Sequence, residues 1–199
     1  EFLQQDAGAL YDRVGYHEWE GLSLDLAECD RLATNLGDNK ALIMRNHGFL
    51  TVGATAGEAY FNGLAGERFC VRNSGADAVV EGVGDHACEY MTGGNAVILG
   101  PTGRNFGAGM SGGFAFVLDA DGSFASRVNT DRVDLEALTS EDEERIQRLL
   151  RRHFHFTRSQ KADEILRKWN TFAPKFVKVF PRDLKLALSD RLESHTGDG

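Results

Sequence analysis

No stretch of the sequence approaches the roughly 20 consecutive apolar residues that a transmembrane helix needs, so we expect no membrane partner. The first residues, EFLQQDAGAL, lack the basic segment and the long apolar segment of a secretory signal peptide. They also do not begin with methionine. These features favour a processed chain, a fragment or a cloned piece.

Cysteine is scarce: Cys29, Cys70 and Cys88 are widely spaced, and none of them belongs to a C-x-x-C pair. An odd and scattered set argues against a disulfide framework and against a zinc knuckle. We therefore expect buried thiols and a reducing, cytoplasmic location. Cys70 and Cys88 are expected to lie in the core on neighbouring coils and not to act as nucleophiles.

A basic surface for nucleic acid is also missing, because the net charge is −8. Hydrophobic residues make up 42% and charged residues 26% of the chain, which is typical of a globular protein. One basic cluster is present, and it fits a solvated helix face better than a phosphate site. It consists of Arg148, Arg151, Arg152 and Arg158.

What the sequence does have is a glycine-punctuated repeat. Gly75, Gly94 and Gly113 are spaced 19 residues apart, and each precedes a short apolar run. The tetrads Met-Thr-Gly-Gly and Met-Ser-Gly-Gly end at the last two of these glycines, and a fainter copy starts at Gly57. Such a repeat is typical of a β-solenoid whose coils stack about 4.8 Å apart, with glycine supplying a positive φ at each corner. A glycine-rich antiparallel sheet is the alternative.

Upstream of the repeat, the sequence predicts a small α/β segment over residues 1–52. Its helix ends at Gly37, and short strands are expected at 41–44 and 49–52. Residues 16–21 are expected to form a loop. The apolar face of the helix consists of Cys29, Leu32, Ala33 and Leu36.

Residues 2–53 resemble the class II aldolase/adducin family, through YHEWEG and LGDNKALIMRNHGFLTVG. Many members of that α/β/α family are zinc-dependent lyases or epimerases of sugar phosphates. The resemblance implies that His47, in the NHG turn, is the third of three zinc-binding histidines. The family's upstream H-x-H pair does not occur in this sequence, and only His17 lies nearby. Because a catalytic zinc has three protein ligands, His47 is alternatively interpreted as a residue that caps a tight turn.

Residues 53–190 resemble the C-terminal domain of the glutamate synthase large subunit, through GLAGERFCVRNSGADAVVEGVGDHACEYMTGG and the tail TRSQKADEILRKWNTFAPKF. The resemblance implies a right-handed parallel β-helix with no catalytic or cofactor-binding residues. Other domains or subunits of the intact enzyme, which converts glutamine and 2-oxoglutarate to two glutamates, are the expected partners. The expected structural glycines are Gly75, Gly82, Gly84, Gly93, Gly94, Gly107, Gly109, Gly112 and Gly113.

Three other patterns resemble ligand sites, and a structural interpretation is favoured for each. Gly107 to Gly112 matches the letters of a dinucleotide-binding loop, but a strand pattern follows it instead of a helix. Residues 85–89 include Asp, His, Cys and Glu, which would alternate along an extended coil and would not converge. Asp119 and Asp121 lie in a turn that lacks the remaining ligands of a calcium loop.

The C-terminal tail, residues 129–192, is expected to be helical and to pack on the β-helix. His153 and His155 are two residues apart, so they would not share a helix face. The sequence predicts two helix caps, from Ser140 with Glu143 and from Thr157 with Gln160. Four aromatic residues are expected to cover an open end of the β-helix: Trp169, Phe172, Phe176 and Phe180.

We interpret the chain as mainly β and as a fusion of two truncated parts: an aldolase-like segment (1–52) and a β-helix (53–128). A helical tail (129–192) and a disordered end (193–199) complete the chain. The favoured function is a non-catalytic structural module. The alternative is the remnant of a zinc-dependent aldolase or epimerase that uses His47. No cofactor is expected apart from zinc in that alternative, and exposed solenoid ends predict self-association.

Overall fold

The structure is a computed structural model of the 199-residue chain, and it describes residues 14–18, 26–39, 41–44, 48–51 and 57–196. The chain divides into two compact units, Glu1–Ala54 and Thr55–Gly199. The first unit contains a small sheet and one helix, and the second contains the glycine repeat. The expectation of a mainly β protein with several helices is confirmed.

The first unit has a three-stranded sheet of order β1-β2-β3. Strand β1 (Val14–His17) is parallel to β2 (Ala41–Met44), which is antiparallel to β3 (Gly48–Thr51). Helix α1 (Leu26–Leu36) ends at Gly37, where φ is +50° and the N–H donates to a helix carbonyl at 3.0 Å. This left-handed glycine is the helix terminator that the sequence predicts.

Strand β1 corrects the expectation of a loop from residue 16 onward. Tyr16 and His17 pair with Ile43 and Met44 of β2. The letters V-G-Y-H carry no alternating apolar pattern, so pairing with a distant segment fixes this strand and local sequence does not.

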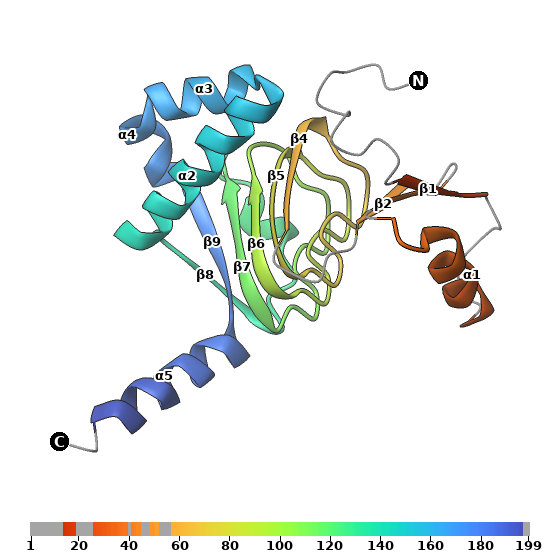
Figure 1. The fold of residues 1–199 in the computed structure, drawn as a ribbon. Coiled ribbons are helices and arrows are strands. Elements are labelled where there is room, and N and C mark those ends of the chain that lie inside the picture. Colours follow the sequence, from red (N-terminus) through yellow and green to blue (C-terminus); the bar gives the residue numbers. More distant parts are fainter. Residues whose placement is uncertain (1–13, 19–25, 40, 45–47, 52–56, 197–199) are drawn as a thin grey trace. The chain divides into compact units, whose positions relative to one another are not determined.

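The second unit is built on a β-solenoid of about three turns (Figure 1). Its parallel strands are β4 (Glu58–Leu64), β5 (Ser74–Gly82), β6 (Thr92–Ile98) and β7 (Gly112–Leu118). The apolar runs stack as predicted, because Ala78 pairs with Ala96 and Ala96 with Ala115.

The spacing of the coils is less regular than the predicted period of 19. The register places Asp77 opposite Asn95, and Asn95 opposite Phe114, which gives steps of 18 and then 19 residues. A register shift between Ser74 and Asp77 gives β5 one residue more than β6 over this stretch. The glycines are therefore aligned in the sequence at a step that the first pair of coils does not keep.

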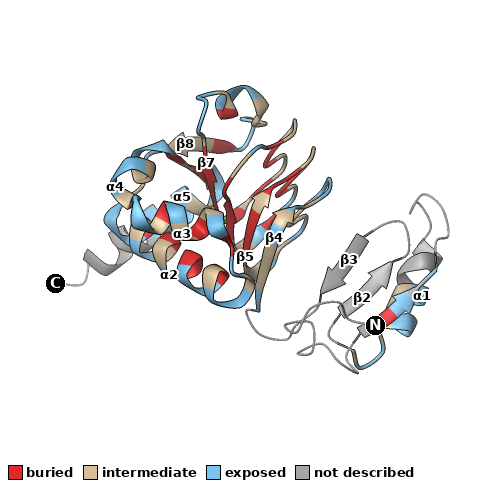
Figure 2. Ribbon diagram, turned by 90° about the horizontal axis from the view of Figure 1, so that it is seen from above, coloured by how far each residue is buried: buried red, intermediate tan, exposed pale blue. Residues whose placement is uncertain are grey.

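The central strands are buried on both faces, as the red ribbons of Figure 2 show. One face packs inside the solenoid, and its buried residues include Val80, Ile98 and Val117. The other face packs against helices, and its buried residues include Val79, Val97 and Phe116. Burial on both faces explains why the runs are continuously apolar and do not alternate.

Two antiparallel strands close one side of this sheet. Strand β9 (Phe176–Pro181) pairs with β7, and β8 (Val133–Glu136) pairs with β9. The sheet order is therefore β4-β5-β6-β7-β9-β8. The backbone of β9 covers the edge of β7, whereas the sequence analysis assigned that role to four aromatic side chains.

Those aromatic side chains pack elsewhere. Trp169, Phe172 and Phe176 belong to the cluster between the sheet and the helices. Phe180 lies against Phe114, with ring centroids 5.2 Å apart. They add to the apolar layer under the helices and do not form a plug.

The helical part of the second unit follows β8 and continues past β9. The helices are α2 (Ser140–Thr157), α3 (Gln160–Arg167), α4 (Trp169–Phe172) and α5 (Arg182–Thr196), with short 3-10 turns η2 (Phe124–Arg127) and η3 (Ala173–Lys175). α5 extends to Thr196, where the sequence analysis expected disorder from residue 193. Within the described ranges, no helix has the length and apolar character needed to cross a membrane.

Both predicted helix caps are displaced by one or two residues. α2 is capped by Thr139, whose hydroxyl accepts the Asp142 N–H at 3.2 Å while the Asp142 carboxylate accepts the Thr139 N–H at 3.0 Å. α3 is capped by Ser159, whose hydroxyl accepts the Ala162 N–H at 3.0 Å. Several Ser, Thr and acidic residues lie near each helix start, so the sequence pattern alone does not select the cap.

Candidate functional site

The glycines of the strand corners lie where neighbouring coils approach each other most closely. Gly94 has a φ of +79°, and a Cβ there would lie 2.2 Å from the carbonyl oxygen of Ala76. Gly113 has a φ of +71°, and its Cβ would lie 2.6 Å from the carbonyl oxygen of Gly94. At Gly93 and Gly112 a Cβ would meet a carbonyl oxygen of the preceding coil at 2.5 and 2.2 Å. These contacts leave no room for a side chain.

Gly75 does not have the positive φ that the sequence analysis expected at each corner, and its Cβ direction is open. Gly82 and Gly84 also lack a positive φ, but a Cβ at each would approach Leu64 and Glu67 of the previous coil at 2.6 and 3.0 Å. Close approach accounts for these last two glycines, whereas nothing in the structure requires glycine at position 75.

The wall opposite the parallel strands has an alternating backbone that the sequence analysis missed. In three stacked segments, every second residue has a left-handed φ between 52° and 70°. Hydrogen bonds join the segments, for example from Cys88 N–H to the Phe69 carbonyl (2.7 Å) and from Tyr90 N–H to the Ala108 carbonyl (2.9 Å). The left-handed residues are Arg68, Cys70 and Arg72; His86, Cys88 and Tyr90; and Asn105, Gly107 and Gly109.

The G-x-G motif marks the third of these segments only, because the two before it carry non-glycine residues at the matching positions. A Cβ at Gly109 would lie 2.6 Å from the ring of Tyr90, and Arg72 lies over the other coil's side of that ring, 5.8 Å from its centroid. Left-handed non-glycine residues cost roughly 1–2 kcal/mol each, so the surrounding coil contacts must compensate for them. The segment after Gly109 opens strand β7 and not a helix, as the sequence predicts, so it is not a dinucleotide fingerprint.

Polar side chains of this wall bind the neighbouring coil. Asp85 accepts the backbone N–H of Arg104 at 2.7 Å and its guanidinium at 2.9 Å, and these hydrogen bonds lower the pKa of Asp85. His86 Nδ1 lies 2.8 Å from Glu89 Oε1, and the Asn105 amide reaches the same oxygen at 3.2 Å. These contacts hold one coil against the next.

The cluster at residues 85–89 is therefore only partly as expected. His86 and Glu89 do converge, whereas Asp85 binds Arg104 and Cys88 is fully buried in the core. Among the described residues, no group of three or more His, Cys, Asp or Glu side chains could hold a metal ion. His47 lies outside the described residues, so its zinc interpretation stays a prediction.

The remaining candidates have structural surroundings. Asp121 accepts the N–H and hydroxyl of Ser123, at 3.0 and 2.6 Å, and these hydrogen bonds lower its pKa. Burial raises the pKa of the Cys70 thiol to about 12, and it raises that of Cys88 well above its ordinary value. Because the thiolate is the nucleophile, both cysteines are inert in the folded chain.

A buried ion pair joins β9 to α2. Lys178 Nζ lies 2.9 Å from Asp142 Oδ2, and both side chains are almost fully buried. The ammonium also lies 4.5 Å from the ring centroid of Phe114, and the Asp142 carboxylate closes the cap of α2 at Thr139. The pair therefore connects the closing strand, the helix start and the aromatic layer.

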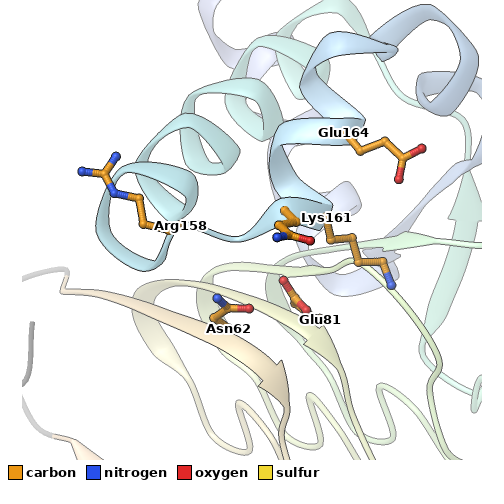
Figure 3. Close-up of a pocket in the computed structure, with 6 residues that line it drawn as sticks. Asn62, Glu81, Arg158, Lys161 and Glu164 are labelled. Carbon is orange, nitrogen blue, oxygen red and sulfur yellow. The ribbon is translucent and has the colours of Figure 1, made fainter. Parts of the chain in front are cut away.

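The α2–α3 hairpin meets β4 and β5 at a polar groove of about 590 Å³, whose lining side chains Figure 3 shows. Asn62 donates to the Thr157 carbonyl at 2.9 Å, and the Ser159 hydroxyl donates to Glu81. These two contacts hold the turn between the helices on the sheet. The groove is lined by Asn62, Glu81, Arg158, Gln160, Lys161 and Glu164.

His153 and His155 do lie on different sides of α2, as their spacing predicts. His153 is fully buried, and His155 is exposed beside Phe156, with ring centroids 4.9 Å apart. His153 Nε2 lies 3.9 Å from Glu81 Oε1, so the buried imidazole belongs to the hairpin junction.

The fold and its contacts define the class of protein: a parallel β-solenoid module whose polar side chains bind neighbouring coils and helices. Residues 34–182 match the family described as the GXGXG motif, and the chain therefore belongs to the GXGXG family found in glutamate synthase large chains. The match includes residues 34–52, which the sequence analysis assigned to the aldolase-like segment.

The relatives agree with this assignment. The chain is 45% identical over 183 residues to the glutamate synthase (NADPH) large chain of Bacillus subtilis, covering 84% of this chain and 12% of the relative. It is 56% identical over 137 residues to glutamate synthase (NADH) of Schizosaccharomyces pombe, covering 68% of this chain and 6% of the relative. It is 51% identical over 145 residues to the ferredoxin-dependent glutamate synthase of Pyropia yezoensis, covering 72% and 9%.

The chain thus spans 12% or less of the length of each of these three relatives. The resemblance to glutamate synthase is confirmed at the level of the GXGXG domain. The class II aldolase resemblance, the fusion and the His47 alternative find no support in these comparisons.

Proposed function

We propose that the chain is a non-catalytic structural module of a glutamate synthase large chain. In this proposal the catalytic parts lie elsewhere in the large chain, and the module braces them or contacts another subunit. The observation that carries the proposal is that the polar side chains of the solenoid bind adjacent coils. Asp85 with Arg104 and His86 with Glu89 and Asn105 are the principal examples.

The packing of the solenoid suits a brace. The strands are buried on both faces, and the coils approach each other so closely that a Cβ at Gly94 or Gly112 would lie 2.2 Å from a neighbouring carbonyl oxygen. Interiors packed at this density transmit displacement and do not absorb it. A rigid element of this kind can hold the spacing between larger domains.

The proposal includes a cytoplasmic location and no cofactor in this chain. Its partners are the other domains or subunits of the large-chain enzyme, and the solenoid end at β4 is a further surface for self-association. No observation on the described residues favours the zinc-dependent aldolase alternative.

The first test assays the purified chain with glutamine, 2-oxoglutarate and an electron donor. We expect no glutamate above the blank, whereas the full-length Bacillus subtilis relative with its electron-donor system serves as the positive control. Glutamate formation by the isolated chain, lost on heat denaturation, would overturn the proposal that the module does no chemistry.

A further inference from the structure

His153 is a buried titratable group that the structural role described above does not use. The side chain is fully buried on the inner face of α2, and its Nε2 has no hydrogen-bond partner. Nδ1 lies 3.4 Å from the Thr157 hydroxyl, which donates its hydrogen to the His153 carbonyl at 2.6 Å. The Thr157 oxygen can only accept at the longer contact, so the hydrogen is on Nδ1 and Nε2 is bare.

The bare Nε2 lies 3.9 Å from Oε1 of Glu81 on β5. That carboxylate oxygen accepts the hydroxyl hydrogen of Ser159, and the Ser159 oxygen in turn accepts the Ala162 N–H as the cap of α3. Glu81 therefore lies between a proton-accepting nitrogen of α2 and the hydroxyl that fixes the start of α3. In Figure 3, Glu81 lies on the sheet side of the groove, below the turn of the hairpin.

We propose that His153, Glu81 and Ser159 form a pH-sensitive latch that holds the α2–α3 hairpin on the solenoid. At neutral pH the bare imidazole leaves Glu81 bound to Ser159, and the hairpin is docked. A proton taken from solvent by Nε2 places a buried N–H⁺ opposite Oε1 and competes with Ser159 for it. No other bond forms or breaks in this step.

The other charges around the junction are engaged separately. Arg152 pairs with Glu58, whose carboxylate also accepts the Tyr60 hydroxyl, and Arg148 lies 4.0 Å from Asp77. Lys161 and Glu164 of α3 line the groove beside Glu81. Tyr60 stacks on the His153 ring at 6.0 Å between centroids, and burial raises its pKa to about 12, so it stays neutral.

The direction of the response follows from the balance at His153. Burial lowers its pKa, and the attraction of Glu81 opposes this without overcoming it. The docked hairpin therefore binds this proton more weakly than an opened one, and acidification below about pH 6.5 favours opening. Each pH unit between the ordinary and the lowered pKa shifts the opening equilibrium by about tenfold.

Amide hydrogen exchange of the full chain tests the latch at about pH 7.5 and about pH 5, after correction for intrinsic exchange rates. We expect protection of α2 and α3 to fall about tenfold or more at the lower pH, with β6 and β7 changing less. The matched control His155→Gln, an exposed histidine of the same helix, should keep the response. His153→Gln should abolish it.

Glu81→Gln separates the histidine from the carboxylate, and it also keeps the test decisive where His153→Gln does not fold. The amide still offers Ser159 an acceptor, while the loss of the negative charge further disfavours the protonated imidazole. We therefore expect a larger loss of hairpin protection at about pH 5 in this variant than in the unaltered chain. The latch is overturned if Glu81→Gln abolishes the response, if His153→Gln keeps it, or if acidification protects the hairpin.

Discussion

Four glycine-to-alanine replacements separate the two costs that the solenoid imposes at its corners. Gly94 has a φ of +79°, and its Cβ would lie 2.2 Å from a carbonyl oxygen of the neighbouring coil. Gly93 has no left-handed φ, but its Cβ would lie 2.5 Å from such an oxygen. Gly122 has a φ of +74° with open space around its Cβ, and Gly75 has neither restriction. The set therefore varies conformation and contact independently.

The expected free energies of unfolding follow from these two terms. Gly75→Ala should stabilise the chain by about 0.5 kcal/mol, because alanine restricts the unfolded chain. Gly122→Ala should destabilise by about 1 kcal/mol through its left-handed φ. Gly93→Ala should destabilise by about 2 kcal/mol, since backbone of the next coil must move. Gly94→Ala combines both effects and should destabilise by about 3 kcal/mol, a large share of a typical total of about 5–15 kcal/mol.

Urea unfolding followed by far-UV circular dichroism measures all four variants on the same footing. The informative comparison is Gly94→Ala with Gly122→Ala, because both have a left-handed φ and only the first meets a neighbouring coil. Equal destabilisation by these two replacements would refute the reasoning, since the coils would then not approach as closely as the structure has them.

Three further predictions concern buried groups. Lys178→Met leaves Asp142 buried without its cation, so urea unfolding should show a loss of about 3–5 kcal/mol that Asp142→Leu in the same chain largely restores; an unrestored loss contradicts this. Burial raises the pKa of Asp142, but the hydrogen bond from Lys178 and the helix cap outweigh it. This stabilisation is present above about pH 4 and lost as the pH falls through the lowered pKa, so Lys178→Met should flatten that acid limb of the unfolding curve. With Cys29 replaced by Ser, Cys70 and Cys88 should react with an aromatic disulfide reagent only after unfolding; reaction of the folded chain contradicts their burial.

The solenoid could be predicted from the sequence because glycine spacing and apolar runs both report the stacking of coils. Gly94 and Gly113 are needed where backbones approach, and the runs around Val97 and Phe116 are continuous because helices cover their second face. The step of 18 residues between β5 and β6 could not be read from the glycines, since it depends on one extra residue before Asp77.

The alternating wall and the hairpin junction carry no comparable sequence signal. Cys88 and Tyr90 adopt the left-handed conformation of Gly107 and Gly109 because neighbouring coils bind their N–H groups, and nothing in their residue types indicates this. Glu81 and Ser159 are 78 residues apart, so only the folded chain brings them together. Long-range contacts of this kind are decided by packing and not by local propensity.

Glutamate formation by the Bacillus subtilis large chain carrying this module tests the central claim most directly. Residues 55–192 of this chain would replace the matching region of the relative, beside a version in which that region is deleted. A structural module that braces the enzyme predicts a soluble, active swapped enzyme and a deletion that is insoluble or inactive. A deleted enzyme that forms glutamate as well as the unaltered one would contradict the claim.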